Sequence, residues 1–171
     1  INASSSTEVL GSAEAGIKVI LYKVNAIDPT DVEMLNEYYF ETMHHEFAHI
    51  LHQKKNYPTE YNQISAADYS STGWQKRTEQ QAWKLGFVTP YAGMEPQEDF
   101  VEVIANYLVK PDGFWENMLA NAGTEGATKI QTKFDMVKEW LMTAWNIDID
   151  ELRTIIIRRS GDIDSILNEK I

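Results

Sequence analysis

The sequence predicts a single α+β domain over residues 1–171 that is mostly helical, with a small strand region near its start and a helical bundle at its end. Two observations predict this class. Most of the chain after residue 30 repeats apolar residues at helical spacing, whereas only residues 17–25 form an apolar, β-branched run typical of a strand. The 171 residues are 43% hydrophobic and 11% aromatic, which is enough to bury one core.

The first residues, 1–16, are rich in Ser, Ala, Gly and Thr and predict a loop or tail. One strand at 17–25 cannot form a stable sheet by itself. We therefore expect either a weak pairing with residues 7–10 or partner strands in a segment outside this chain. The chain begins at Ile1 rather than Met, so we expect the native protein to carry a further N-terminal segment.

The next element is a helix expected over about 31–55, because no Gly or Pro interrupts this apolar-rich stretch. Thr30 and Glu33 have the spacing of a capping box, which predicts where this helix begins. An irregular loop is expected over 56–73. Further helices are expected near 75–85, 97–109, 113–121, 126–145, 149–159 and 162–169. Gly86 has the position of a residue that ends the first of these helices.

The motif His45-Glu46-Phe47-Ala48-His49 lies inside the helix expected at 31–55. Residues i and i+4 share a helix face with Cβ atoms about 5–6 Å apart, so His45 and His49 can hold one zinc ion at roughly 2.0–2.1 Å. Glu46 then lies beside the metal, where it can take a proton from water. The alternative is a helix that carries these residues by chance. The apolar flanks oppose that alternative, because burying a His-Glu-His stripe without a partner is costly.

A catalytic zinc usually has three protein ligands, and residues 97–105 supply candidates for the third. Apolar residues at helical spacing predict a helix here, with Glu98 and Glu102 one turn apart on another face. Glu98 could ligate zinc, while Glu102 accepts a hydrogen bond from the far nitrogen of a ligand His and so fixes its orientation. Asp99 is a rival ligand that spacing does not exclude. A solvated acidic face is the alternative without a metal.

These two motifs together resemble the gluzincin metallopeptidases. In that group the first Glu of the second helix is the third zinc ligand, and the acid four residues later lies behind a ligand His. Those positions are Glu98 and Glu102 in this chain. The pattern is most similar to the anthrax lethal factor catalytic domain, in which a Tyr seven residues before the ligand Glu assists catalysis. Tyr91 has that position here.

The strings at 86–92 and 98–102 also resemble zinc-binding metallopeptidase lipoproteins of gut bacteria, which are often encoded beside outer-membrane nutrient importers. The likeness covers about residues 10–160. It implies a gluzincin-like zincin fold in which the motif helix lies under a sheet and the strand at 17–24 runs beside the cleft. It also implies an extracytoplasmic outer-membrane lipoprotein whose lipid anchor lies outside this chain, with a peptide or protein substrate and nutrient-import components as partners.

The leading hypothesis is a zinc-dependent peptidase in which His45, His49 and Glu98 hold the metal and Glu46 is the general base. By the resemblance, the Tyr91 hydroxyl helps to stabilise the oxyanion. The runner-up is a non-catalytic capture or assembly module of a nutrient-uptake system that keeps the metal for folding. A zinc hydrolase acting on a non-peptide amide is a third alternative. A closed site of four protein ligands would favour the module, and an open position in a cleft would favour an enzyme.

Other features exclude several classes of protein. The formal net charge of −11 disfavours nucleic acid and anionic membrane surfaces as direct partners. The sequence has no Cys, no Gly-rich phosphate loop and no nucleophile elbow, and Lys55 stands where a metzincin has its third His. Of the remaining histidines, His44 is expected on the surface or in packing. His52 shares the face of His45 and is expected behind the ligands or along the cleft.

Overall fold

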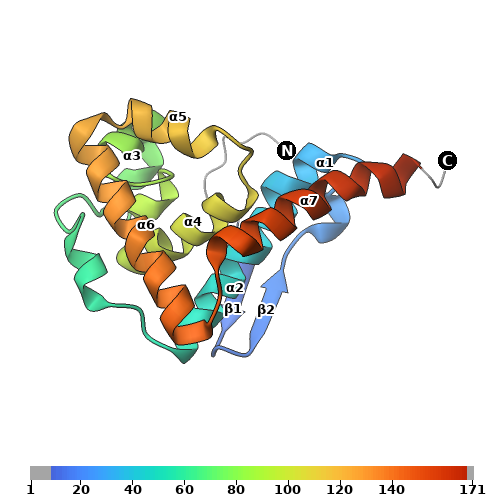
Figure 1. The fold of residues 1–171 in the computed structure, drawn as a ribbon, viewed down its shortest axis with the longest axis horizontal. Coiled ribbons are helices and arrows are strands. Elements are labelled where there is room, and N and C mark those ends of the chain that lie inside the picture. Colours follow the sequence, from blue (N-terminus) through green and yellow to red (C-terminus); the bar gives the residue numbers. More distant parts are fainter. Residues whose placement is uncertain (1–8, 169–171) are drawn as a thin grey trace.

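The computed structural model describes residues 9–168, with side chains as far as residue 162. It is mostly helical with one small sheet, as the sequence predicts (Figure 1). The sheet consists of β1 (Gly11–Glu14) and β2 (Lys18–Leu21). The longer helices are α2 (Glu41–Lys54), α4 (Pro96–Val109), α6 (Gly123–Trp145) and α7 (Ile149–Asn168). The shorter elements are η1 (Val24–Ala26), α1 (Val32–Met34), η2 (Leu35–Phe40), η3 (Thr59–Gln63), η4 (Gly73–Lys76), α3 (Glu79–Leu85), η5 (Tyr91–Gly93) and α5 (Phe114–Asn121).

β1 and β2 form an antiparallel hairpin whose register places Gly11 opposite Leu21. The prediction of a loop or tail over 1–16 is therefore wrong at β1. β2 pairs with β1, so the pairing lies mostly after the expected segment 7–10, of which Leu10 takes part by accepting a hydrogen bond from the Tyr22 amide at 2.8 Å. The sheet therefore forms within the chain itself. Residues 1–8 lie outside the described part of the chain.

The hairpin turn explains why β1 is hard to recognise in the sequence. Ala15 and Gly16 have positive φ angles of 53° and 65°, and the Ile17 amide donates to the Glu14 carbonyl at 3.0 Å. Asn, Asp or Gly usually occupy such turn positions, and Ala rarely does. The strand is held instead by its contacts with β2 and α2, which are tertiary and leave no local pattern.

Residues 32–54 form one helical run made of α1, the π-helical η2 and α2, close to its predicted bounds. Its N-cap is Asp31, whose side chain accepts a hydrogen bond from the Met34 amide at 2.9 Å. The amide and hydroxyl of Thr30 bond instead to the Asp28 side chain. The predicted capping box is therefore wrong by one residue, because Thr and Asp are both good N-caps and the backbone uses the second.

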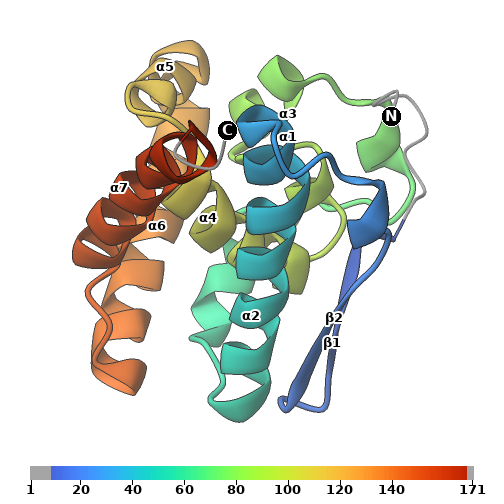
Figure 2. The ribbon, with the colours of Figure 1, turned by 90° about the vertical axis from the view of Figure 1, so that its right-hand side faces the viewer.

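α4 is the central helix of the core. The side chains of Phe100, Val101 and Ile104 are buried, and the helix packs against α2, α6 and α7. Figure 2 shows α2 in the middle of the molecule, with the β1–β2 hairpin on one side and α6 and α7 on the other. Packing of α4 on α2 places the two sequence motifs against each other.

α5 and α6 lie close to their predicted bounds, whereas α3 begins at Glu79 and not near residue 75. α3 begins with a capping box made by Thr78 and Gln81 and ends at Gly86, which has a φ of 89°. α6 packs closely on α3 at Gly126, where a Cβ atom would lie only 2.3 Å from the Trp83 carbonyl oxygen. α6 in turn packs on α4 and lies on the side of it away from the hairpin (Figure 2).

The C-terminal helices differ from the prediction in one respect. Asn146, with a φ of 55°, ends α6 at the predicted break. α7 then continues without interruption, so the predicted separation into 149–159 and 162–169 is wrong. Gly161 lies inside this helix, where Gly costs about 1 kcal/mol relative to Ala but does not end the helix. Within residues 9–168, no helix has both the length and the apolar character needed to cross a bilayer.

Candidate metal centre

Three side chains from the two motifs converge where α2 packs on α4. Oε2 of Glu98 lies 3.1 Å from Nε2 of His45 and 3.4 Å from Nε2 of His49. The two Nε2 atoms are 3.2 Å apart, and all three ligand atoms lie within 4.8 Å of one another. The structure thus brings together the three residues that the sequence predicts as metal ligands.

This group of donors fits a zinc ion. Two imidazoles and one carboxylate are the protein ligands of one type of catalytic zinc site, which keeps a fourth position open. When both imidazoles present a lone pair at Nε2, as metal ligands do, they cannot hydrogen bond to one another, whereas a cation between them satisfies both nitrogens. Among the described residues, His45, His49 and Glu98 form the group that could hold a metal ion.

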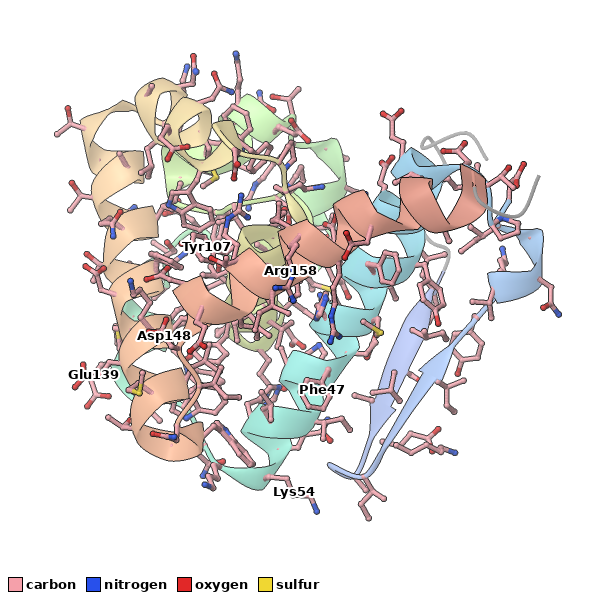
Figure 3. All side chains as sticks on the ribbon, turned by 45° about the vertical axis from the view of Figure 1, so that its right-hand side comes forward. Phe47, Lys54, Tyr107, Glu139, Asp148 and Arg158 are labelled. Atoms are coloured by element: carbon pink, nitrogen blue, oxygen red, sulfur yellow. The ribbon has the colours of Figure 1, made fainter. Side chains whose placement is uncertain are left out.

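The helical period decides which side chains of α2 reach this centre. His45 and Glu46 are buried, and Ala48 packs into the core. Phe47 points away from the centre and is 51% exposed (Figure 3). Positions four apart on a helix share a face, so the two histidines line up while the residues between them turn elsewhere.

The Glu102 carboxylate lies behind His45, with Oε1 2.7 Å from Nδ1. Its Oε2 accepts a hydrogen bond from the Thr89 hydroxyl at 2.5 Å, and Asn106 Nδ2 lies 3.4 Å away. The Thr89 hydroxyl in turn accepts from the Ala92 amide at 3.1 Å. A carboxylate on Nδ1 fixes the ring and leaves Nε2 facing the metal position. Thr89 carries no signal in the sequence, because it lies in an irregular segment.

Asp99, the rival ligand, lies elsewhere. Its carboxylate is fully buried and pairs with Lys133 of α6 at 2.6 Å. The Tyr69 hydroxyl donates to the same oxygen at 2.6 Å. Successive helical residues differ by about 100° in direction, so Glu98 faces α2 while Asp99 faces the core.

The charges within the centre are strongly coupled. Burial by itself would lower the pKa of His45, but hydrogen bonds to Glu102 and Glu98 outweigh it and raise the pKa to about 10. Burial would raise the pKa of Glu98, but hydrogen bonds to His45 and His49 outweigh that effect and lower it. The carboxylates therefore stabilise positive charge at this position, which is what a divalent cation requires.

Glu46 is 7% exposed and lies against the hairpin. A Cβ atom at Gly11 would lie 2.6 Å from Cγ of Glu46. The backbone of β1 therefore lies so close to the Glu46 side chain that only Gly fits at this position without a shift. Burial raises the pKa of Glu46, partly opposed by His45 and His49. Gly11 is a site residue that the sequence analysis missed, because its role depends on a strand that the local pattern does not reveal.

Tyr91 lies in η5, beside the centre. Its ring centroid is 5.9 Å from that of His45, and the Trp74 ring packs edge-on against it at 5.0 Å. Burial, followed by the Glu98 charge, raises the pKa of Tyr91. The hydroxyl therefore stays protonated near neutral pH and can donate a hydrogen bond.

The two remaining histidines behave differently. His52 is buried, and its Nε2 lies 2.8 Å from Nδ1 of His49. Burial, assisted by His49, lowers the pKa of His52 to about 4. His44 is half-buried, and burial lowers its pKa to about 4. The contact between His52 and Nδ1 of His49 places His52 directly behind a predicted ligand, as Glu102 lies behind His45.

Comparison with known proteins agrees with this geometry. Residues 1–150 match the family described as "Putative zinc-binding metallo-peptidase". The chain belongs to this family. A crystal structure described as a putative zinc-binding metallo-peptidase from Bacteroides caccae has 52% sequence identity to this chain and a TM-score of 0.81. The match covers 92% of this chain and 60% of that chain. No curated protein matches the chain.

The family confirms two predictions made from the sequence. The resemblance to zinc-binding metallo-peptidases is confirmed, and zinc is the metal that the family description names. The mostly helical α+β class is confirmed as well. The gluzincin and lipoprotein parts of the resemblance and the roles of the individual site residues stay predictions.

Proposed function

We propose that this protein hydrolyses peptide bonds, with His45, His49 and Glu98 as zinc ligands and Glu46 as the general base. The observation that carries the proposal is the position of Glu46 beside this group of donors. Its carboxylate is buried and feels the charges of all three ligands. A buried acid next to two imidazoles and a carboxylate is the arrangement that metal-assisted hydrolysis needs.

When bound, zinc supplies Lewis-acid chemistry, which lowers the pKa of water toward about 7 and polarises a carbonyl group. The chain supplies the proton transfers. Glu46 takes a proton from water as the oxygen attacks the peptide carbonyl carbon, and then gives it to the leaving nitrogen as the C–N bond breaks. Burial raises the pKa of Glu46, which makes it a stronger base than an exposed Glu.

Tyr91 is proposed to donate a hydrogen bond to the oxyanion that forms on the carbonyl oxygen. Its ring lies beside the His45 ring, and its raised pKa keeps the hydroxyl proton in place. A donor that acts on charge developing in the transition state contributes about 2.7–4 kcal/mol.

The number of ligands favours an enzyme over a non-catalytic module that keeps its metal for folding. Structural zinc sites use four protein ligands, whereas catalytic sites use three and leave one position for water or substrate. Within residues 9–168, the group that could hold a metal has three members. His52 is not a fourth member, because its Nε2 faces Nδ1 of His49.

The location and partners of the protein follow from the family resemblance alone. We propose that it acts outside the cytoplasm on a peptide or protein, as an outer-membrane lipoprotein associated with nutrient-import components. Fractionation of the native protein, followed by detection in outer-membrane vesicles, tests this location. Recovery in the cytoplasmic fraction would contradict it.

The hydrolytic function is tested with a diverse peptide library. We expect the purified protein to cleave peptides, a chelator to stop cleavage and added zinc to restore it. Glu46→Gln should keep zinc but lose about 10²–10⁴-fold in turnover, because an amide cannot accept the proton. Cleavage that survives chelation, or full turnover by Glu46→Gln, would contradict the mechanism. A wild-type protein that binds zinc but cleaves nothing would favour the capture or assembly module.

A further inference from the structure

We propose that His52 is a positioning residue of the metal site: its Nε2 accepts a hydrogen bond from Nδ1–H of His49 and so holds Nε2 of His49 toward the metal. His52 lies outside the motif that defines the site. It acts on the metal through His49 and touches neither the metal position nor the substrate.

The geometry within α2 supports this assignment. His49 and His52 are three residues apart on the helix, so their side chains are neighbours. His49 Nδ1 and His52 Nε2 are 2.8 Å apart, and the ring centroids are 5.1 Å apart with the planes at 62°. The lone pair of His52 Nε2 can therefore lie in line with the N–H of His49.

The chemistry of imidazole then fixes both tautomers. A neutral His has one ring nitrogen that donates and one that accepts. His49 must present a lone pair at Nε2 to bind a metal, so its proton lies on Nδ1. His52 must then accept at Nε2 and carry its own proton on Nδ1. Any other arrangement either breaks the 2.8 Å contact or places a proton where the metal binds.

Aromatic packing holds His52 in this orientation. His52 is 7% exposed, and its ring meets the edge of Tyr57 at 5.7 Å and 80°. Tyr57 in turn stacks on Phe100 of α4 at 4.2 Å and 12°. The His52 ring is buried and packs on Tyr57, which Phe100 of α4 holds in place, so it has little freedom to turn away from His49.

The two ligand histidines therefore have different partners. His45 is backed by the Glu102 carboxylate, and His49 by a neutral imidazole. A carboxylate at the second position would add negative charge to a site that already contains Glu98 and Glu102. A neutral acceptor orients the ligand without that charge, so the metal keeps more of its Lewis acidity.

Zinc affinity tests the proposal through three matched substitutions on α2, measured by competition with a chromophoric chelator. His52→Leu removes the acceptor and should weaken zinc binding by about 10–100-fold. His52→Gln keeps an acceptor of similar reach and should stay within about threefold of wild type. His44→Gln changes a half-buried histidine of α2 that points about 100° away from His45, and should have no effect. Cobalt-substituted protein provides a second measurement, because its absorption spectrum should change for His52→Leu and not for His52→Gln.

Each outcome decides the proposal. Wild-type affinity for His52→Leu would overturn it. An equal loss for His52→Leu and His52→Gln would also overturn it, because packing and not the hydrogen bond would then be responsible. Thermal melting with chelator present separates a loss of fold from a loss of metal affinity. The proposal is supported if His52→Gln binds zinc as the wild type does and the melting temperatures of the metal-free variants are unchanged. It rests on the metal site and not on hydrolysis, so a protein that binds zinc but cleaves no peptide leaves it intact.

Discussion

At the scale of single residues, Gly11 limits the space that is available to the Glu46 side chain. A Cβ atom at Gly11 would lie 2.6 Å from Cγ and 2.7 Å from Oε1 of Glu46. These distances are below van der Waals contact, so either the strand or the carboxylate must move. We expect Gly11→Ala to lower kcat by up to about 10²-fold, the cost of a misplaced group in an active site, while zinc affinity is unchanged.

Gly161→Ala is the matched control for this substitution. Nothing lies within 4 Å of a Cβ atom at that position, and the residue is helical, so kcat should equal that of wild type. Both variants are measured on a peptide that the wild type cleaves. Unchanged turnover in Gly11→Ala would show that Glu46 can give way without loss.

Tyr91 offers a second test at this scale. If its hydroxyl bonds to the oxyanion, Tyr91→Phe removes an interaction that exists only in the transition state. We therefore expect kcat to fall by about 10²–10³-fold at a nearly constant KM. Steady-state kinetics on the same peptide measures both constants. A rise in KM at constant kcat would show that Tyr91 binds substrate instead.

At the scale of elements, α4 carries two acids to the metal centre and a third into the core. The buried pair between Asp99 and Lys133 joins α4 to α6 at 2.6 Å, and both side chains are 0% exposed. Lys133 also donates to the Gly86 carbonyl at 2.7 Å. This network fixes the rotation of α4 about its axis, and that rotation decides whether Glu98 or Asp99 faces the histidines.

Breaking this pair should therefore cost much more than breaking a surface pair. Lys133→Met leaves the Asp99 carboxylate buried without its cation, and we expect a loss of about 3–5 kcal/mol in the free energy of unfolding. Lys129→Met, one turn earlier on α6, loses the more exposed pairs with Asp68 and Glu125 and should cost about 0–1 kcal/mol. Urea unfolding with chelator present measures both. Similar losses for the two variants would show that the buried pair adds no more than the exposed ones.

The two helices that carry the site can be predicted from the sequence, whereas the hairpin beside them cannot. Helical spacing predicts α2 and α4 and the faces they present, because each helix carries its apolar stripe within a short stretch. β1 is missed because strand pairing is non-local and Ala15 hides the turn. For the same reason the contact of Gly11 with Glu46 has no local signal, since it joins two elements more than thirty residues apart.

At the scale of the whole molecule, the candidate centre depends on few elements. α2 and α4 supply every predicted ligand, the hairpin confines Glu46, and η5 brings Tyr91 alongside. α6 and α7 lie on the other side of α4 and support it through the core. The chain spans about 60% of the Bacteroides caccae chain that it matches.

Metal binding changes the protonation of the whole buried centre. In the metal-free protein, hydrogen bonds to Glu102 and Glu98 outweigh burial and raise the pKa of His45 to about 10, above the ordinary value of 6.5. The stability that this proton contributes is therefore complete below about pH 6.5 and is lost as pH rises through about 10. At pH 7 His45 carries a proton that zinc must displace, so each zinc ion bound should release about one proton.

Zinc affinity should consequently rise about tenfold for each pH unit between about pH 7 and pH 9, and level off near pH 10. Calorimetry at pH 7 in two buffers with different ionisation enthalpies counts the released protons. Chelator competition at several pH values measures the slope. Glu102→Gln removes the carboxylate charge from His45, so it should release fewer protons and bind zinc about 10–100-fold more weakly. A proton count near zero in the wild type would mean that His45 is already neutral at pH 7. Glu98 and Glu102 would then raise the pKa of His45 less than their distances from it indicate.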